Sequence, residues 1–125
     1  MEHPKIWIVD NDPIDSQIIK EMLEINQLAK DVRLFHSNEE VLKAINSNSN
    51  APEIIITENR TQNVNGWKLM EVARNKFRDT KKTSFHMVSS ALTNTDLRAF
   101  KSSKLLKSLS KKPLRLDDLL GMVKG

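Results

Sequence analysis

The segment Ile54-Ile55-Ile56-Thr57-Glu58 decides the fold of this chain. Its first four residues are apolar or β-branched, with no alternation of polar and apolar positions, and the segment ends at the carboxylate of Glu58. A short run that is apolar on both faces is typical of a strand inside a parallel sheet, because helices cover both faces of such a sheet. Polar, turn-forming residues precede it from Ser47 to Pro52, and a polar loop follows it from Asn59 to Asn65. The segment is therefore predicted to be a buried parallel strand.

Four more segments show the same behaviour less strongly. Lys5–Val9 is apolar and ends abruptly in Asp10-Asn11-Asp12, while 85–88 ends in Ser89. A short strand is also predicted at 32–35, and the weakest one spans 105–110.

Helical patterns separate these strands. Asp12 is placed to cap a helix that has Pro13 in its first position, and Ile14, Ile18, Met22 and Ile25 recur at helical spacing. The other helices are predicted to begin at the capping box Ser37–Glu40, at Gly66, at the cap-like run 93–96, and beyond Pro113.

Strand and helix thus alternate five times, which predicts an α/β fold with a doubly wound, five-stranded parallel sheet and helices on both faces. With 125 residues, the chain has room for a single domain, residues 1–125. It has no cysteine, no apolar run long enough to span a membrane, and no signal-peptide pattern at Met1-Glu2-His3-Pro4. A cytoplasmic protein without membrane contact is the resulting expectation.

Side chains with definite chemistry follow the predicted strands. They are two carboxylates and an amide after the first strand, Glu58 after the third, Ser89 after the fourth and Lys112 after the fifth. Ligands of open α/β sheets bind beyond the carboxyl ends of the strands, so these groups are expected to meet at one rim. Two carboxylates after the first strand would repel a phosphate, which argues against a nucleotide site and for a site that holds a cation. The alternative is that Glu58 is only an acid in a loop.

Four short motifs resemble those of the response-regulator receivers of two-component systems, including the chemotaxis receivers, and they follow one another in the order found in that family. The motifs are Ile8–Pro13, Pro52–Trp67, Val88–Ser90 and Lys111–Pro113. The resemblance covers the whole chain. It implies the flavodoxin-like strand order 2-1-3-4-5, an acidic pocket at Asp10, Asn11 and Asp12, a switch hydroxyl at Ser89 and the family's lysine at Lys112.

The chain departs from the family at the position that receives the phosphoryl group. The family has an aspartate where this chain has Glu58, and a misplacement of ~1 Å can cost about 100-fold in rate. The second acid of the family's pair is Asn11, which leaves Asp10 as the metal ligand and predicts weak or absent Mg²⁺ binding. Lys112, with Arg60 as a candidate second cation, is expected to pair with Glu58. The resemblance therefore implies an atypical, single-domain receiver whose phosphoryl uptake is lost or impaired.

A cationic run marks the fourth-to-fifth element face, comprising Lys101, Lys104, Lys107, Lys111, Lys112 and Arg115 in a chain of net charge +4. It is first of all a solvated surface. It is also a candidate docking face for a histidine kinase or another signalling protein, since receivers commonly use this face. The three histidines share no metal-binding spacing.

Function is thus expected to lie in protein–protein contact, not in enzymatic turnover. Two alternatives stay open. One is a receiver that still takes up phosphate on a nearby carboxylate. The other is a basic nucleic-acid-binding module on the same fold, although no interleaved aromatic residues accompany the charges. The oligomeric state is left open.

Overall fold

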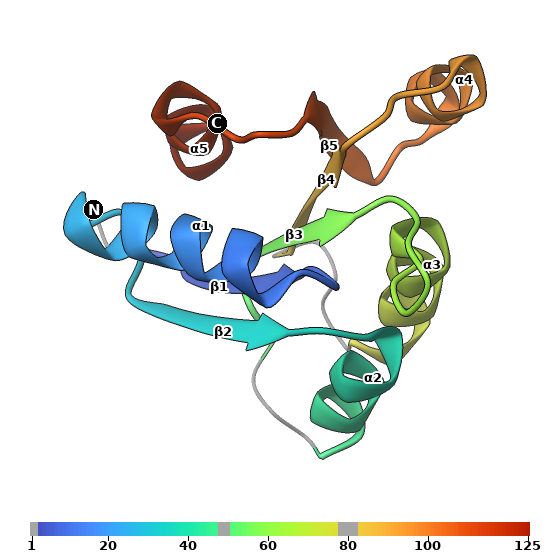
Figure 1. The fold of residues 1–125 in the computed structure, drawn as a ribbon. Helices are drawn as coiled ribbons and strands as arrows, with labels where there is room; N and C mark the ends of the chain where they lie inside the picture. The colour runs from blue at the N-terminus through green and yellow to red at the C-terminus, as the bar shows by residue number, and fades with distance from the viewer. Residues whose placement is uncertain (1–2, 48–50, 78–82) are drawn as a thin grey trace.

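A computed structural model of the chain describes residues 3–47, 51–77 and 83–125, and it contains five strands and five helices in strict alternation (Figure 1). In chain order these are β1 (Lys5–Val9), α1 (Pro13–Ile25), β2 (Asp31–Phe35), α2 (Asn38–Asn46), β3 (Ile54–Glu58), α3 (Gly66–Lys76), β4 (Ser84–Ser89), α4 (Asn94–Ser102), β5 (Leu106–Lys111) and α5 (Leu116–Lys124). Of the loop expected between Ser47 and Pro52, residues 48–50 lie outside the described residues.

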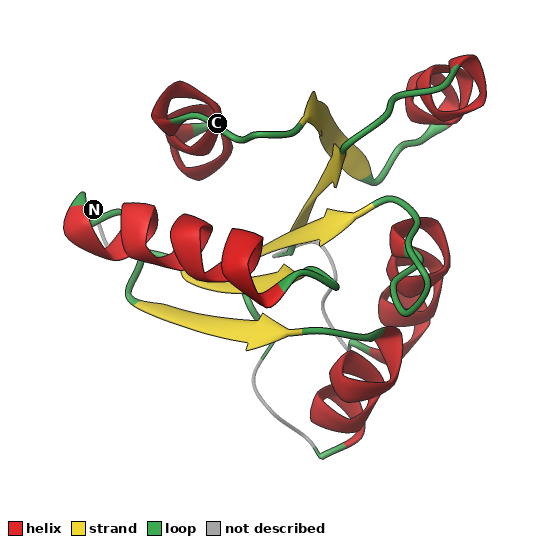
Figure 2. Cartoon of the chain, in the orientation of Figure 1, coloured by secondary structure: helices red, strands yellow, loops and turns green. Residues whose placement is uncertain are grey.

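The five strands form one parallel sheet in the order β2-β1-β3-β4-β5, which confirms the predicted fold class (Figure 2). Helices α1 and α5 lie on one side of the sheet, and α2 and α3 lie on the other (Figure 1). The non-alternating apolar runs explain this arrangement. In β1, Ile6 and Ile8 join the core beneath α1 and α5, while Trp7 and Val9 join the core on the opposite side.

Each side of the sheet has its own hydrophobic core. Beneath α1 and α5, the core contains Leu23, Ile56 and Leu119, each at most 2% exposed. On the other side, Ile55, Phe85 and Met87 pack against residues of α2 and α3, with Phe100 of α4 at the margin. None of the helices in the described ranges is long and apolar enough to cross a membrane.

Helix α1 is confirmed, but of the apolar stripe that predicted it, Met22 packs against the core and the three isoleucines face outward. Ile14, Ile18 and Ile25 are 70%, 50% and 79% exposed, whereas Ile19 and Leu23 are buried. Ile19 and Leu23 are four residues apart and therefore share a face, so a shorter stripe is enough to anchor the helix on β1 and β2. The exposed isoleucines leave apolar surface on the outside of α1.

The helix caps follow the sequence closely. The Asp12 carboxylate accepts hydrogen bonds from the backbone of Ile14 and Asp15, and Ser37 accepts one from Glu40. Glu40 reaches back to the backbone N–H of His36 and not to that of Ser37, so the second half of the expected capping box is shifted by one residue. At α4, the box of Thr93 and Asp96 is complete.

Candidate functional site

The sheet register brings Asp10 and Glu58 together at the carboxyl edge. Val9 of β1 pairs with Thr57 of β3, so Asp10, the first residue after β1, lies beside Glu58, the last residue of β3. Asp10 is held by its backbone N–H, which donates to the Phe35 carbonyl at 2.9 Å. Asp10 is 2% exposed and Glu58 8% exposed, so two carboxyl groups lie largely out of water at this edge.

The backbone around Glu58 is closely packed. A β-carbon on Gly66 would overlap the Glu58 carbonyl oxygen, so the first residue of α3 has to be a glycine for the helix to approach this closely. The Gly66 N–H donates to the carbonyl of Asn59 at 2.8 Å and closes the loop between β3 and α3. Glu58 is therefore fixed at its backbone by α3 as well as by β3.

The ammonium of Lys112 lies among three carboxylates. Its Nζ is 2.9 Å from Asp10 Oδ2, 3.1 Å from Glu58 Oε2 and 3.1 Å from Asp15 Oδ2. The other oxygen of Glu58 accepts the backbone N–H of Asn11 at 2.6 Å. The backbone N–H of Asp12 donates to Asp10 Oδ1 at 2.8 Å. Both oxygens of each buried carboxylate are thus already hydrogen-bonded.

These contacts perturb the ionisation of the cluster. Burial raises the pKa of Glu58, and the adjacent Asp10 raises it further, while the Asn11 N–H and the Lys112 ammonium act in the opposite direction. Burial alone would lower the pKa of Lys112, but its hydrogen bonds to Asp10, Glu58 and Asp15 outweigh burial and raise that pKa above its usual value. The lysine is therefore held charged, and the surroundings of Glu58 favour its protonated form more than water does.

The resemblance to receivers raised the question of a divalent cation at this edge, and the side chains present do not fit one. Asp10 Oδ2 and Glu58 Oε2 both face the Lys112 ammonium. The carbonyl oxygen of the Asn11 side chain accepts from Asn63 at 2.9 Å and is directed to the loop after β3. In the described part of the chain, no group of three or more acidic or histidine side chains is arranged to hold a metal ion. A cation would have to displace the lysine first.

Two of the predicted site residues stand apart from the cluster. Ser89 lies at the same edge of the sheet, but its hydroxyl donates to the Ala91 carbonyl at 2.7 Å and accepts the Ala91 N–H. Arg60 is exposed, and its backbone pairs with Asn65 in the loop. Among residues 3–47, 51–77 and 83–125, no ion pair joins Arg60 to Glu58. The structure gives no support to a contact between Arg60 and Glu58, and the assistance of Arg60 to Lys112 stays a prediction.

Sequence reasoning missed two contributors. Asp15 was not among the predicted site residues. It lies in the first turn of α1, where the helix dipole favours an acid, and one turn of helix brings it to Lys112. Its position three residues after the cap Asp12 was the available signal. Asn59 donates to Asp96 at 3.0 Å, and both side chains are buried. The residue beside Glu58 is thereby connected to the N-terminus of α4.

Asp96 is a well-supported charge within this second network. Burial alone would raise its pKa, but hydrogen bonds from Thr93, Trp67 and Asn59 outweigh burial and hold the pKa below its usual value. Asp96 therefore stays ionised and ties the start of α4 to the loop after β3.

Comparison with known proteins places this arrangement in one fold. No family model matches the chain, and no curated protein matches it by sequence. Solved structures do match. A two-component response regulator from Cytophaga hutchinsonii is 18% identical, with a TM-score of 0.87 over 98% of this chain and 96% of that one. A chemotaxis response regulator of Vibrio cholerae is 16% identical, with a TM-score of 0.79 and 98% of both chains covered.

A third match comes from Methanospirillum hungatei. Its response regulator receiver domain is 21% identical and has a TM-score of 0.80, over 98% of this chain and 92% of that chain. Identities this low establish the fold alone. The chain therefore has the fold of a response-regulator receiver domain, and its activity has to be argued from its own site.

Proposed function

We propose that the chain is an atypical receiver module of two-component signalling, held in one fixed state and acting by contact with other proteins in the cytoplasm. The observation that supports this most directly is the position of Lys112. Its ammonium occupies the space between the carboxylates of Asp10 and Glu58, and it neutralises charge there without a metal ion.

The geometry of Glu58 supports a loss of phosphoryl uptake. Both oxygens of Glu58 are hydrogen-bonded, one to the Asn11 N–H and one to Lys112, and these contacts hold the carboxylate in one orientation and draw negative charge away from it. Glu58 is also one methylene longer than aspartate, which moves the nucleophile away from the position used for in-line transfer. A long carboxylate anchored to Lys112 would partly imitate a phosphorylated aspartate, and the signal would be constant.

Incubation with acetyl phosphate and Mg²⁺, followed by intact-mass measurement, tests the proposal. The wild-type chain is expected to gain no phosphate. The double variant that combines Glu58→Asp with Asn11→Asp restores both acids of the family pattern. It is expected to take up a fraction of one equivalent of phosphate. Glu58→Gln is the matched control without a nucleophile. Phosphate on the wild-type chain that disappears in Glu58→Gln would overturn the proposal.

The same experiment addresses the first alternative. A phosphate adduct that survives Glu58→Gln would place the acceptor on a neighbouring carboxylate. Asp12 and Asp15 are the candidates, since Asp12 is exposed and the Asp15 side chain is 44% exposed. Peptide mapping of the adduct would then identify the residue.

The proposed partner face is the cationic surface of α4 and β5, with an acidic surface of a histidine kinase or another signalling protein as its partner. Lys101, Lys104 and Lys111 are all exposed there, and Leu97 is 43% exposed on α4. A cluster of exposed positive charges raises the rate of association with an acidic partner, and that rate then falls as the salt concentration rises.

Charge reversal tests this face. A triple variant of this face, which combines Lys101→Glu, Lys104→Glu and Lys111→Glu, should no longer capture the partner in pull-downs. A control triple variant, which combines Lys30→Glu, Lys43→Glu and Lys68→Glu, changes the charge by the same amount on other faces and should still capture the partner. Equal capture by both triple variants would remove the face from consideration. Salt-dependent binding of DNA or RNA oligonucleotides, lost in the first variant, would favour the nucleic-acid alternative.

A further inference from the structure

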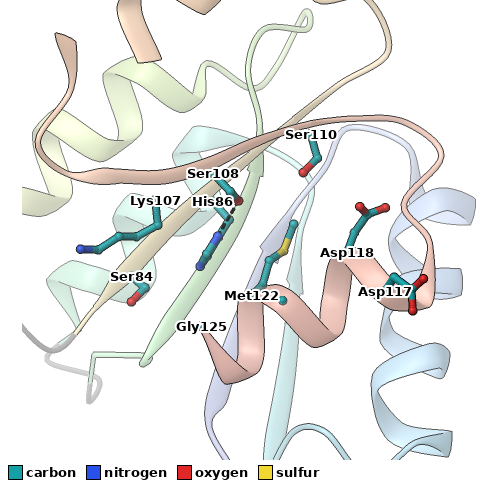
Figure 3. Close-up of a pocket in the computed structure, with 10 residues that line it drawn as sticks. Ser84, His86, Lys107, Ser108, Ser110, Asp117, Asp118, Met122 and Gly125 are labelled. Carbon is teal, nitrogen blue, oxygen red and sulfur yellow. Dashed lines mark hydrogen bonds between the residues drawn. The ribbon is translucent and has the colours of Figure 1, made fainter. Parts of the chain in front are cut away.

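Beneath α5, at the outer edge of the sheet, the side chains on the surface of the sheet change from apolar to polar. Under α1 this side of the sheet is apolar, with Ile6 and Ile8 in the core. Beneath α5, β4 and β5 instead present polar side chains, which are Ser84, His86, Ser108 and Ser110 (Figure 3). Such a polar surface is not what a covering helix needs, so it calls for a separate explanation.

An irregularity in β5 produces this polar surface. Phe85 pairs with Leu106, but His86 pairs with Ser108, so Lys107 is an extra residue without a partner on β4. A bulge shifts the alternation of the strand by one position. Leu106 and Leu109, three residues apart, consequently both pack against the core on the α4 side. Ser108 and Ser110 are left on the side of α5.

A hollow of about 510 Å³ lies over these residues and is closed on one side by α5. Gly121 of α5 lines it, and a β-carbon added there would have no heavy atom within 4 Å. The hollow continues past Met122 to Gly125 (Figure 3). Its volume lies within the range of small-molecule sites, which is about 300–1,000 Å³.

His86 is the buried group that needs a partner. It is 5% exposed, and its Nδ1 lies 2.7 Å from the Ser108 hydroxyl. Its Nε2 is buried and has no hydrogen-bond partner among the described residues. Figure 3 shows the imidazole directed into the space between Ser84 and the end of α5. A buried polar atom without a partner is unfavourable, and a water or a ligand from outside the chain is one way to satisfy it.

Charges are distributed unevenly around the hollow. Lys107 is at the His86 end, close enough for its ammonium to oppose protonation of the imidazole. Asp117 and Asp118 are at the other end, on the first turn of α5. One oxygen of Asp118 already accepts the Arg115 backbone N–H at 2.8 Å, so Asp117, which is exposed, is the more available acceptor of the two. One end of the hollow thus favours an anion and the other favours hydroxyl donors.

We infer that the hollow between β4, β5 and α5 binds a small molecule that carries one anionic group, a phosphate or a carboxylate, together with hydroxyl groups. The anionic group lies against Lys107, with the hydroxyls of Ser84 and Ser108 beside it, and its binding opens the contact to Nε2 of His86, which is buried in this structure. The ligand's hydroxyl groups donate to Asp117. This site is separate from the cluster around Lys112, and its existence does not depend on the proposed receiver function.

Histidine ring signals provide the test. Wild-type chain labelled with ¹⁵N is titrated at constant ionic strength with inorganic phosphate, acetate or glycerol 3-phosphate, and long-range ¹H–¹⁵N correlations of the His86 ring are followed. Saturable shifts are expected, with glycerol 3-phosphate binding more tightly than either simple anion. An anion beside the ring favours its charged form, so the pKa of His86 should rise from about 4, and binding should tighten as the pH falls. A stronger response to acetate than to phosphate would assign the carboxylate class.

Two pairs of variants make the result specific. Gly121→Leu fills the hollow and should weaken binding about tenfold or more, while Gly121→Ala adds a single methyl group and should change it little. Lys107→Gln should weaken binding similarly, and Lys111→Gln on the same strand should not. Both glycine variants should fold, because the position is open and a helix interior favours alanine or leucine over glycine.

Three outcomes would overturn the inference. The first is a shift that grows linearly and equals that caused by sodium chloride. The second is unchanged binding in both Gly121→Leu and Lys107→Gln. The third is binding that is lost in Lys112→Met and kept in Lys107→Gln, because it would place the anion at the acid cluster and not in the hollow.

Discussion

The ammonium of Lys112 lies 3.1 Å from Oε2 of Glu58, although 54 residues separate the two in the chain. The parallel sheet makes this contact possible, because β3 and β5 deliver their last residues to the same edge. Asp10 completes the arrangement at 2.9 Å from the same ammonium. The cluster therefore unites the ends of β1, β3 and β5.

Removing the ammonium should destabilise the chain. In Lys112→Met, the carboxylates of Asp10 and Glu58 stay buried without a counter-charge, and breaking a buried ion pair in this way costs about 3–5 kcal/mol. Since the pKa of Glu58 is raised, part of that cost is relieved when Glu58 takes up a proton, so the lower end of the range is expected. The contact to Asp15 adds little, because the Asp15 side chain is 44% exposed. Urea denaturation measures the free energy of unfolding.

The matched control is Lys111→Met, one residue earlier and exposed, which should leave the midpoint unchanged. A Lys112→Met variant as stable as the wild-type chain would show that the acids do not depend on the lysine.

Magnesium binding should respond to the same substitution. In the wild-type chain, Mg²⁺ has to compete with Lys112 for Asp10 and Glu58, so calorimetry should detect weak binding or none. Lys112→Met frees both carboxylates, and Asn11→Asp adds a third hard ligand, so each variant should bind Mg²⁺ about tenfold more tightly or better. Binding by the wild-type chain at millimolar Mg²⁺ or below, with no gain in either variant, would contradict a lysine that excludes the metal.

Much of the fold could be predicted because runs such as Ile54–Thr57 are apolar on both faces, and only a covered parallel sheet satisfies them. Two features could not. The outward stripe of α1 has the same helical spacing as a buried one, and the spacing alone does not say which face packs. The bulge at Lys107 depends on which leucines of β5 reach the core, and that is decided by the partner strand β4.

The site was predictable to the extent that the backbone determines it. Asp10 and Glu58 follow strands in register, so their meeting is a consequence of topology. Ser89 reaches the same edge, but its hydroxyl finds a nearer partner in the backbone of Ala91. Local hydrogen bonds of this kind compete with longer-range ones, and sequence spacing does not reveal which will form. Asp15 was missed because the helix dipole already explains an acid in the first turn of α1, so neither its type nor its place indicated a second role.

The two faces of α1 should differ sharply in their effect on stability. Leu23→Ala should cost about 2–5 kcal/mol, because Leu23 is 0% exposed and its removal leaves a cavity. Ile18→Ala should change stability by less than about 0.5 kcal/mol, since Ile18 is 50% exposed and loses little packing. Thermal or urea unfolding of the two variants decides the matter. Similar losses in both would mean that the outward stripe is covered in solution, for instance by a second copy of the chain.

The stability of the chain should fall in mild acid because of His86. Burial, reinforced by the charge of Lys107, lowers the pKa of His86 from 6.5 to about 4. Between these values the unfolded chain binds a proton at this residue and the folded chain does not, so stability decreases as the pH falls through the window. At about 1.4 kcal/mol per pKa unit, the loss attributable to His86 is at most about 3 kcal/mol. Glu58 contributes with the opposite sign above pH 4.5, since its pKa is raised in the folded chain.

The two contributions are separated by comparing unfolding free energies at several pH values between 7 and 4 in the wild-type chain and in His86→Leu. The leucine cannot be protonated and removes the unpartnered Nε2, so the variant should lose less stability in acid than the wild-type chain and become the more stable of the two near pH 4. His3→Ala, at an exposed histidine, serves as the control and should follow the wild-type curve. If the wild-type and His86→Leu curves run parallel over the whole range, His86 is protonated as readily in the folded chain as in the unfolded one, and its lowered pKa is refuted.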